Sequence, residues 1–175
     1  MSLEAGQLSA RACNYSLLRK ASRRVSLAYD RVLAPSGLST AQFAILVEIA
    51  SWPEDEGPTM AALADALVMD RAALTQSLKP LVAGKLVLIK GSPVDRRVRH
   101  ARLSALGRKR LEVAGALWIQ AQNAFAQAFG EEESIALRAL LGMVVRRVTP
   151  PAPAAGRASR AEAARKEKSA PHRQS

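Results

Sequence analysis

The spacing of apolar residues near the start of the chain predicts a long amphipathic helix over about residues 8–33. Its apolar positions are separated by alternating steps of three and four residues, which place side chains on one face of a helix. They are Leu18, Ala21, Val25, Ala28 and Val32. Pro35 and Gly37 follow and are expected to end the helix.

A second helix is predicted to run to Ala50, with Ser39 or Thr40 as its cap. The segment that follows, 51–58 (SWPEDEGP), has the composition of an acidic loop.

A short helix, a tight corner and another helix are predicted next. Thr59 can cap the first of them, and Leu63 and Leu67 lie on its inner side. Asp70 can cap the second, where its negative charge suits the positive end of the helix dipole. The inner side of this second helix is formed by Leu74, Leu78, Leu81 and Val82. Its outer side is polar and consists of Arg71, Thr75, Gln76 and Lys79.

A two-stranded β-hairpin, here called the wing, is predicted after these helices. Residues 85–90 form a short β run, residues 91–93 (GSP) turn the chain, and residues 99–103 return. Ser104 can then cap a long helix that continues to about Phe129.

A last helix is predicted after Gly130, which ends the one before it. Glu131, Glu132 and Glu133 suit the positive end of its dipole. Apolar positions continue to Val148.

Composition supports a mainly α fold with this small wing. Apolar residues make up 49% of the 175 residues but aromatic residues only 4%, and the helix formers Ala and Leu dominate. From Thr149 the chain is rich in Ala, Pro and Ser and has nothing large to bury, which predicts a disordered tail over 149–175. We therefore expect one folded domain over about 8–148.

The net charge of +11 favours a polyanionic partner, either nucleic acid or an anionic membrane surface. The tail, with six basic and two acidic residues, contributes +4, so +7 remains on residues 1–148. Between Asp70 and Arg110 there are eleven Lys or Arg residues and two acids. A membrane partner is disfavoured, because no run of 18 apolar residues exists and the charge lies on a hairpin.

A helix, a corner, a polar-faced helix and a basic wing together predict a winged helix-turn-helix. Such a fold holds one helix in the DNA major groove while the wing reaches the adjacent backbone. The residues expected to contact DNA are Arg71, Thr75, Gln76, Lys79, Asp95, Arg96, Arg97 and Arg99. We expect one wing arginine to enter the minor groove and Asp95 to orient another through a salt bridge. The alternative for both groups is ordinary solvated charge.

The order of these elements resembles the multiple antibiotic resistance regulator (MarR) family from about Cys13 to Val148. The most specific segments are LRKASRRVSLAYDRVLAPSGLSTAQFAIL, DRAALTQSLKPLVAGKLV and VDRRVRHARLSALGRKRL. The resemblance implies a homodimeric transcription factor, usually a repressor on a palindromic operator, that a small ligand or an oxidant often releases. It also implies dimerisation through the first and last two helices, with the DNA-binding part over about 40–104.

Three positions depart from the family pattern. Val68 stands in the corner where the family often has Gly, so the corner is expected to be tighter or helical. Ala105 replaces a frequent Pro, which changes little. Tyr15 occupies the position of the reactive cysteine in the family's organic-hydroperoxide sensors. Cys13 lies two residues earlier, and its side chain is therefore rotated by about 200°.

Cys13 is nevertheless the redox candidate, because the helix dipole and Arg11 can lower the pKa of its thiol. The alternative is an inert thiol in the subunit interface. Since it is the only cysteine, an intrachain disulfide is impossible, and we expect a cytoplasmic protein without a secretory signal.

The sequence also contains candidate sites of other kinds. A basic cluster in the first helix is expected to bind either an acidic effector or acids of a partner subunit; it consists of Arg19, Lys20, Arg23 and Arg24. His100 has no second ligand at metal spacing, so no metal or cofactor is expected. The chain has no phosphate loop, no GxGxxG and no Ser, His and acid constellation, so we expect no enzyme. The alternative function is a non-specific, architectural nucleic-acid binder, and residues that bind an effector cannot be assigned.

Overall fold

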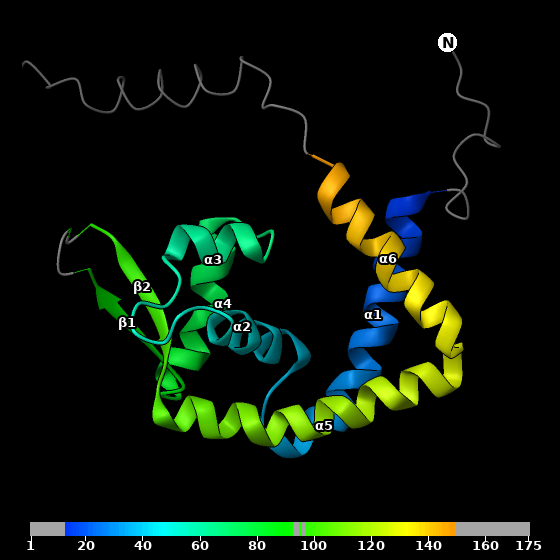
Figure 1. The fold of residues 1–175 in the computed structure, drawn as a ribbon, viewed down its shortest axis with the longest axis horizontal. Helices are drawn as coiled ribbons and strands as arrows, with labels where there is room; N and C mark the ends of the chain where they lie inside the picture. The colour runs from blue at the N-terminus through cyan, green and yellow to red at the C-terminus, as the bar shows by residue number, and fades with distance from the viewer. Residues whose placement is uncertain (1–12, 93–94, 96, 150–175) are drawn as a thin grey trace, which may run out of the picture. The chain divides into compact units, whose positions relative to one another are not determined.

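The computed structural model describes residues 13–92, 95 and 97–149 (Figure 1). Their elements are α1 (Asn14–Leu33), the 3₁₀ helix η2 (Ala34–Ser36), α2 (Thr40–Ala50), α3 (Met60–Ala66), α4 (Arg71–Ala83), β1 (Val87–Gly91), β2 (Arg99–Leu103), α5 (Ala105–Phe129) and α6 (Glu131–Arg147). This order confirms a mainly α, winged helix-turn-helix fold with long helices at its ends. The chain divides into two compact units at residues 128 and 129, which are described separately. The predicted helical residues 8–12 and nearly all of the predicted tail lie outside the described residues.

The helix caps in the first unit are those that the sequence predicts. Ser39 and Gln42 form a reciprocal capping box at the start of α2. The side chain of Thr59 accepts a hydrogen bond from the backbone N–H of Ala62, and Asp70 caps α4 in the same way. Each such cap contributes about 1 kcal/mol, so the sequence determines locally where these helices begin.

One apolar core is shared by the helices α1, α2, α3 and α4 and by the hairpin. Its most deeply buried side chains are Leu33, Leu46, Leu63, Leu74, Leu81 and Val87. β1 and β2 are antiparallel, with Val87 paired to Leu103 and Gly91 paired to Arg99. Burying a Leu or Val side chain contributes about 1.5–3 kcal/mol, so this core fixes α4 and the wing relative to each other.

Aromatic contacts hold α5 against α1 and α2. The hydroxyl of Tyr29 donates to Oε1 of Gln122 at 2.5 Å, and its ring meets Phe125 edge-on, with centroids 6.3 Å apart. Phe43 of α2 stacks on Trp118 of α5 at 6.3 Å.

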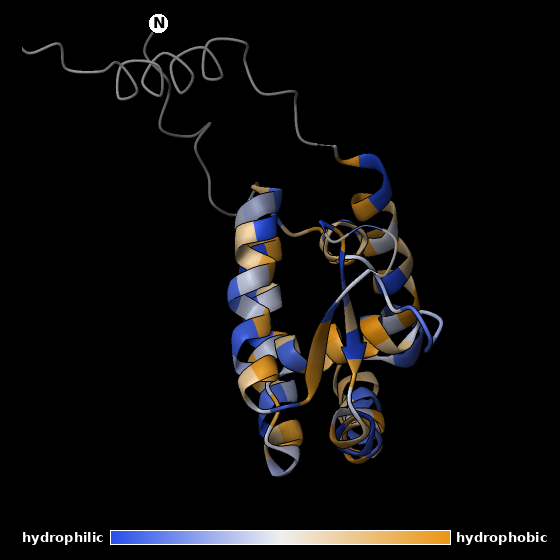
Figure 2. Ribbon diagram, turned by 90° about the vertical axis from the view of Figure 1, so that its left-hand side faces the viewer, coloured by the Kyte–Doolittle hydropathy of each residue, from blue (hydrophilic) through white to orange (hydrophobic). Residues whose placement is uncertain are grey.

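The apolar row of α1 is largely not part of this core. Only Tyr29 and Leu33 are buried in α1, while Leu18 is 39% exposed. Hydrophobic and hydrophilic residues lie side by side along the helices, as Figure 2 shows. An apolar row outside the core of its own chain is typical of a surface that contacts another molecule.

The second unit contains α6, which has an acidic first turn and a basic last turn. Negative charge at the N-terminus and positive charge at the C-terminus of a helix both interact favourably with its dipole, so both turns stabilise the helix. Its N-cap residue is Gly130, whose φ of +106° suits glycine. Several apolar side chains are exposed, namely Ile135, Leu140, Leu141, Val144, Val145 and Val148.

The corner between α3 and α4 was expected to be tighter or helical, and at Val68 it is not helical. Val68 has a φ of +52°, in the left-handed region, and its backbone N–H donates to the carbonyl of Asp65. The chain therefore adopts at Val68 a conformation that glycine adopts freely and that costs a residue with a Cβ about 1–2 kcal/mol.

Val68→Gly is expected to raise the free energy of unfolding by about 1 kcal/mol, since it removes this strain. The side chain is 74% exposed, so little packing is lost. Thermal unfolding measures the effect. Val68→Ala keeps the Cβ and is expected to gain less; an equal gain in both variants would contradict backbone strain as the cause.

Within the described ranges, no single helix is long and apolar enough to cross a membrane. The segments Asn14–Ser36 and Thr40–Ala50 reach the required length and hydropathy only together, across a bend of 73°.

Candidate nucleic-acid interface

α4 presents the polar side that the sequence predicts. Leu74, Leu78 and Leu81 are buried against the core. The four predicted contact residues Arg71, Thr75, Gln76 and Lys79 are all exposed. Ala72 is exposed as well, between Arg71 and the turn that carries Gln76. The pattern of polar positions does not single out Ala72, because a small apolar residue gives no signal of a polar contact surface.

Thr75 uses its hydroxyl inside the helix. Oγ1 donates to the backbone carbonyl of Arg71 at 2.7 Å. A hydroxyl has one proton to donate, so while this bond is intact Thr75 offers a methyl group and an acceptor oxygen but no donor.

A groove of about 550 Å³ separates α4 from the wing. The residues that line this α4–wing groove are Met60, Arg71, Leu74, Thr75, Leu78, Lys79, Val82, Ala83, Ile89 and Arg99. Its apolar lining is flanked by cations from both α4 and β2. Val82, expected in the core, is 41% exposed here, because the hairpin covers the leucine side of α4 and leaves the groove side open. That prediction was wrong.

The structure brings the wing arginines to the start of α4. Arg71, Arg97 and Arg99 line one smaller pocket of about 290 Å³, together with Thr59, Met60, Ala61 and Val98. Arg97 and Arg99 are exposed. Five of the predicted contact residues, Arg71, Thr75, Lys79, Arg97 and Arg99, therefore line these two neighbouring pockets, and Gln76 lies on the outer face of α4.

Asp95 forms hydrogen bonds within the turn of the wing. Its Oδ1 accepts from the backbone N–H of Arg97 at 2.9 Å, and its carbonyl accepts from the N–H of Val98. Among the residues that the structure describes, the ion pair is Arg108 with Glu54, so Asp95 shapes the turn of the wing and does not pair with the side chain of Arg97 or Arg99. Arg96 lies outside the described residues, so a salt bridge between Asp95 and Arg96 stays a prediction.

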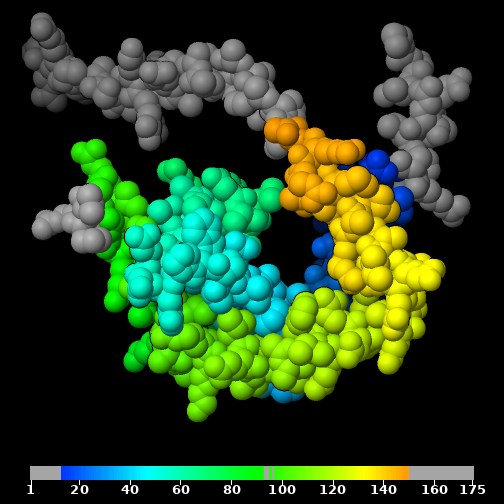
Figure 3. All heavy atoms as spheres, in the orientation of Figure 1, coloured from blue at the N-terminus to red at the C-terminus, as the bar shows by residue number. Residues whose placement is uncertain are grey.

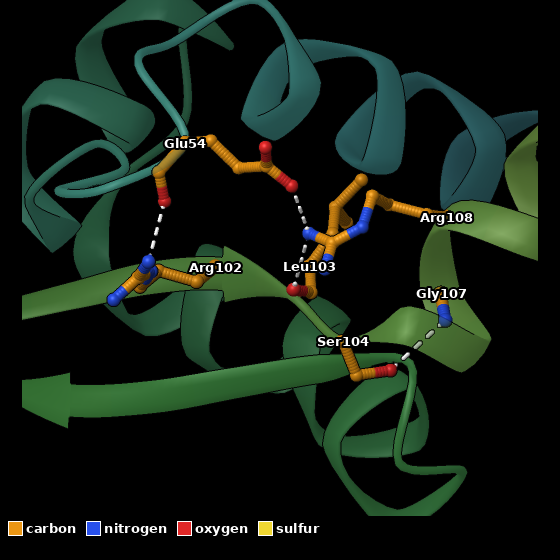
Figure 4. A network of polar contacts seen from close by, with 6 residues as sticks. All are labelled: Glu54, Arg102, Leu103, Ser104, Gly107 and Arg108. Atoms are coloured by element: carbon orange, nitrogen blue, oxygen red, sulfur yellow. Dashed lines mark hydrogen bonds and ion pairs between the residues drawn. The ribbon is translucent and has the colours of Figure 1, made fainter.

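The acidic loop 51–58 holds the base of the wing (Figure 4). Glu54 pairs through Oε1 with Arg108 at 2.6 Å, and its carbonyl accepts from Arg102 of β2 at 2.6 Å. The imidazole Nδ1 of His100 lies 3.0 Å from the carbonyl of Gly57. In the space-filling view the α2–α3 segment lies directly against the hairpin (Figure 3). His100 thus joins the wing to this loop.

Gly57 allows the loop to approach β2 closely. Its φ is +66°, and a Cβ there would lie 2.2 Å from the carbonyl oxygen of Ala101. The adjacent carbonyl of Pro58 accepts from the N–H of Ala101 at 2.9 Å. This contact between a loop and a strand more than forty residues away is not visible in the sequence pattern.

Cys13 is exposed and precedes the first turn of α1. Hydrogen bonding from Ser16, first through its backbone N–H and then through its hydroxyl, lowers the pKa of the Cys13 thiol. The cause is therefore the free N–H group of a helix N-terminus. In the described part of the chain, no group of three His, Cys, Asp or Glu side chains could hold a metal ion.

The basic cluster of α1 is exposed along one side of the helix. Its members Arg19, Lys20, Arg23 and Arg24 make no ion pair within the described residues. It lies on α1, and its members are not among the residues that line the α4–wing groove.

Solved structures with this fold include DNA-bound regulators. The transcriptional regulator MosR of M. tuberculosis, in complex with DNA, is 30% identical; the similarity covers 78% of this chain and 99% of MosR, with a TM-score of 0.62. The transcriptional repressor CouR, bound to a 23-mer DNA duplex, is 25% identical over 82% of this chain and 99% of CouR, with a TM-score of 0.69. CouR from Rhodococcus jostii RHA1, bound to p-coumaroyl-CoA, matches at 19% identity over 82% and 99%, with a TM-score of 0.66, which shows a common fold.

The sequence model of the MarR family matches residues 36–98, which include α2, α3, α4 and β1. A comparison with curated protein sequences finds no match. Since MosR is 30% identical and covered over 99% of its length, and the family model matches the helix-turn-helix itself, the chain belongs to the MarR family of DNA-binding transcriptional regulators.

Proposed function

We propose that this regulator is a homodimeric repressor that binds a palindromic operator sequence-specifically and is released by a small-molecule or oxidant signal. The observation that carries the DNA-binding part is the α4–wing groove, where cations of α4 and of β2 face one another. A recognition helix in the major groove beside a wing on the backbone requires such an arrangement. We assign the DNA-binding part to about residues 40–104.

The groove fits a DNA strand that passes between α4 and the wing. Its apolar lining, which includes Val82 and Ile89, suits the deoxyribose rings. Arg71 and Arg99 are placed to neutralise phosphates on either side. In this arrangement Gln76 faces base edges and can pair with adenine.

The dimer is proposed from the apolar residues that each unit leaves exposed. α1 carries an apolar row outside the core, and α6 exposes Ile135, Val145 and Val148. Covering these surfaces with a second copy would give two recognition helices, which would enter successive major grooves about 34 Å apart. Size-exclusion chromatography with light scattering tests the dimer.

A small-molecule signal is supported by CouR, which is known both with DNA and with p-coumaroyl-CoA. For an oxidant the candidate is Cys13, whose thiol is exposed and has a lowered pKa. One assay of release from the operator distinguishes the two signals, because Cys13→Ser would abolish release by peroxide and leave release by a ligand intact.

Selection of bound fragments from random or genomic DNA at physiological salt tests the proposed specificity. We expect a palindromic consensus with half-sites one helical turn apart. The second candidate, an architectural binder, is favoured by the net charge of +11 and the basic tail. Equal affinity for random and selected DNA would establish this second candidate instead.

Lys79→Ala and Arg97→Ala are expected to weaken DNA binding in different ways. Lys79 lies on α4, so its loss should alter base preference as well as affinity. Arg97 lies in the wing, so its loss should weaken all sequences alike and reduce the slope of log K against log salt by about one per protomer. Titrations at several salt concentrations measure both; identical slopes and preferences in the two variants would contradict these roles.

A further inference from the structure

Two side chains that carry methyl groups lie near Gln76 on the exposed side of α4. Ala72 precedes Gln76 by one helical turn, and Thr75 is adjacent to it; all three side chains are exposed. Thr75 donates its hydroxyl proton to the carbonyl of Arg71 at 2.7 Å. Ala72 and Thr75 are three residues apart, so their methyl groups are neighbours on the side of α4 between Gln76 and the α4–wing groove.

The surroundings of Thr75 favour the bond from its hydroxyl to the carbonyl of Arg71. The side chain lines the α4–wing groove together with Leu78, Val82 and Ile89. Such neighbours give the hydroxyl no alternative acceptor on the groove side, whereas the carbonyl one turn earlier satisfies it. The hydroxyl proton is therefore not available to a base or a phosphate while this bond is intact.

Thymine is the base that such a surface recognises. In the major groove it alone presents a 5-methyl group, and Ala and Thr methyl groups are suitable apolar contacts for it. We propose that Ala72 and the methyl group of Thr75 contact thymine 5-methyl groups in each half-site, next to an adenine bound by Gln76. This inference rests on the proposed sequence-specific binding and names the bases that are read.

Replacing thymidine by deoxyuridine tests the inference directly. Deoxyuridine forms the same base pair and lacks only the methyl group. Each thymidine of the selected operator is replaced singly. A thymidine outside the DNA segment that the protein covers serves as a control. Losing one buried methyl is expected to weaken binding about fourfold at one or two positions of each half-site, with no change at the control position.

Two variants of Thr75 separate the methyl group from the hydroxyl. Thr75→Ser keeps the hydroxyl, so it should bind the thymidine and deoxyuridine operators equally at one sensitive position. Thr75→Val keeps a methyl there, so it should still distinguish them. Ala72→Gly should remove the discrimination at the other position. The result in each variant is the ratio of two affinities, so a general loss of helix stability cancels.

Three outcomes would contradict the inference. If an operator fully substituted with deoxyuridine bound as well as the thymidine operator, this inference would be overturned while the proposed function would stand. So would normal discrimination by Thr75→Ser together with its loss in Thr75→Val, since the hydroxyl would then be the contacting group. A selection that returns no preferred sequence would overturn the proposed function and this inference together.

Discussion

Gly107→Ala is expected to lower the free energy of unfolding by about 3 kcal/mol, at the upper end of the usual cost of overpacking. A Cβ at this position would lie 2.1 Å from the carbonyl oxygen of Leu86 and 3.0 Å from its carbonyl carbon. Both atoms are backbone, and the same carbonyl accepts from the N–H of Ser104 at 3.0 Å. The first turn of α5 would therefore have to move away from β1, which differential scanning calorimetry would record as a lower Tm.

Gly115→Ala is the matched control in the same helix. An added Cβ there meets nothing within 4 Å. It should raise the stability by up to about 1 kcal/mol, because Ala is the better helix former. We expect the free energy of unfolding to fall for Gly107→Ala and to rise for Gly115→Ala. Destabilisation of similar size in both variants would show that α5 tolerates no added methyl group and that contact with Leu86 is not the cause.

Gly57→Ala is expected to weaken DNA binding by at least about tenfold, the equivalent of ~1.4 kcal/mol. The Cβ would collide with the carbonyl of Ala101, and the φ of +66° would strain any residue with a Cβ. Relief requires β2 to shift away from the acidic loop, and β2 carries Arg99 into the α4–wing groove. DNA titration of the folded variant measures the loss.

Gly91→Ala supplies the comparison for this second variant. Gly91 pairs with Arg99 in the same hairpin, and a Cβ there meets nothing within 4 Å. It should leave DNA affinity unchanged. If Gly57→Ala bound DNA normally while remaining folded, the loop would not set the position of the wing.

Local signals predicted the helices and strands well because each depends on neighbouring residues. Ser39, Thr59 and Asp70 are all caps in the structure, as predicted. The exposed polar side of α4 also follows from short-range spacing. For the same reason the positions of Thr75 and Gln76 on α4 were predictable, although their contacts with DNA remain predictions.

Features that depend on distant segments were not predictable. Val82 has the spacing of a core residue, yet whether a hairpin covers it is decided by the packing of β1. Likewise, the acidic loop looked like a solvated connection, while Glu54 and Gly57 contact a strand that follows more than forty residues later. The internal bond of Thr75 was also missed, since a pattern of polar positions does not tell a free hydroxyl from one bonded to its own helix.

The junction between α1, α2 and α5 has a mechanical consequence. Asp30, in the last turns of α1, accepts from both the N–H and the hydroxyl of Thr40 at the start of α2, at 2.6 and 2.7 Å. Arg110 of α5 donates to the carbonyl of Ser36, between those two helices, at 2.7 Å. Such a junction resists bending, so a tilt of α1 imposed from outside would carry α2 and the segments packed on it as one rigid body. In a dimer, an angular change of a few degrees there would alter the separation of two recognition helices without deforming either one.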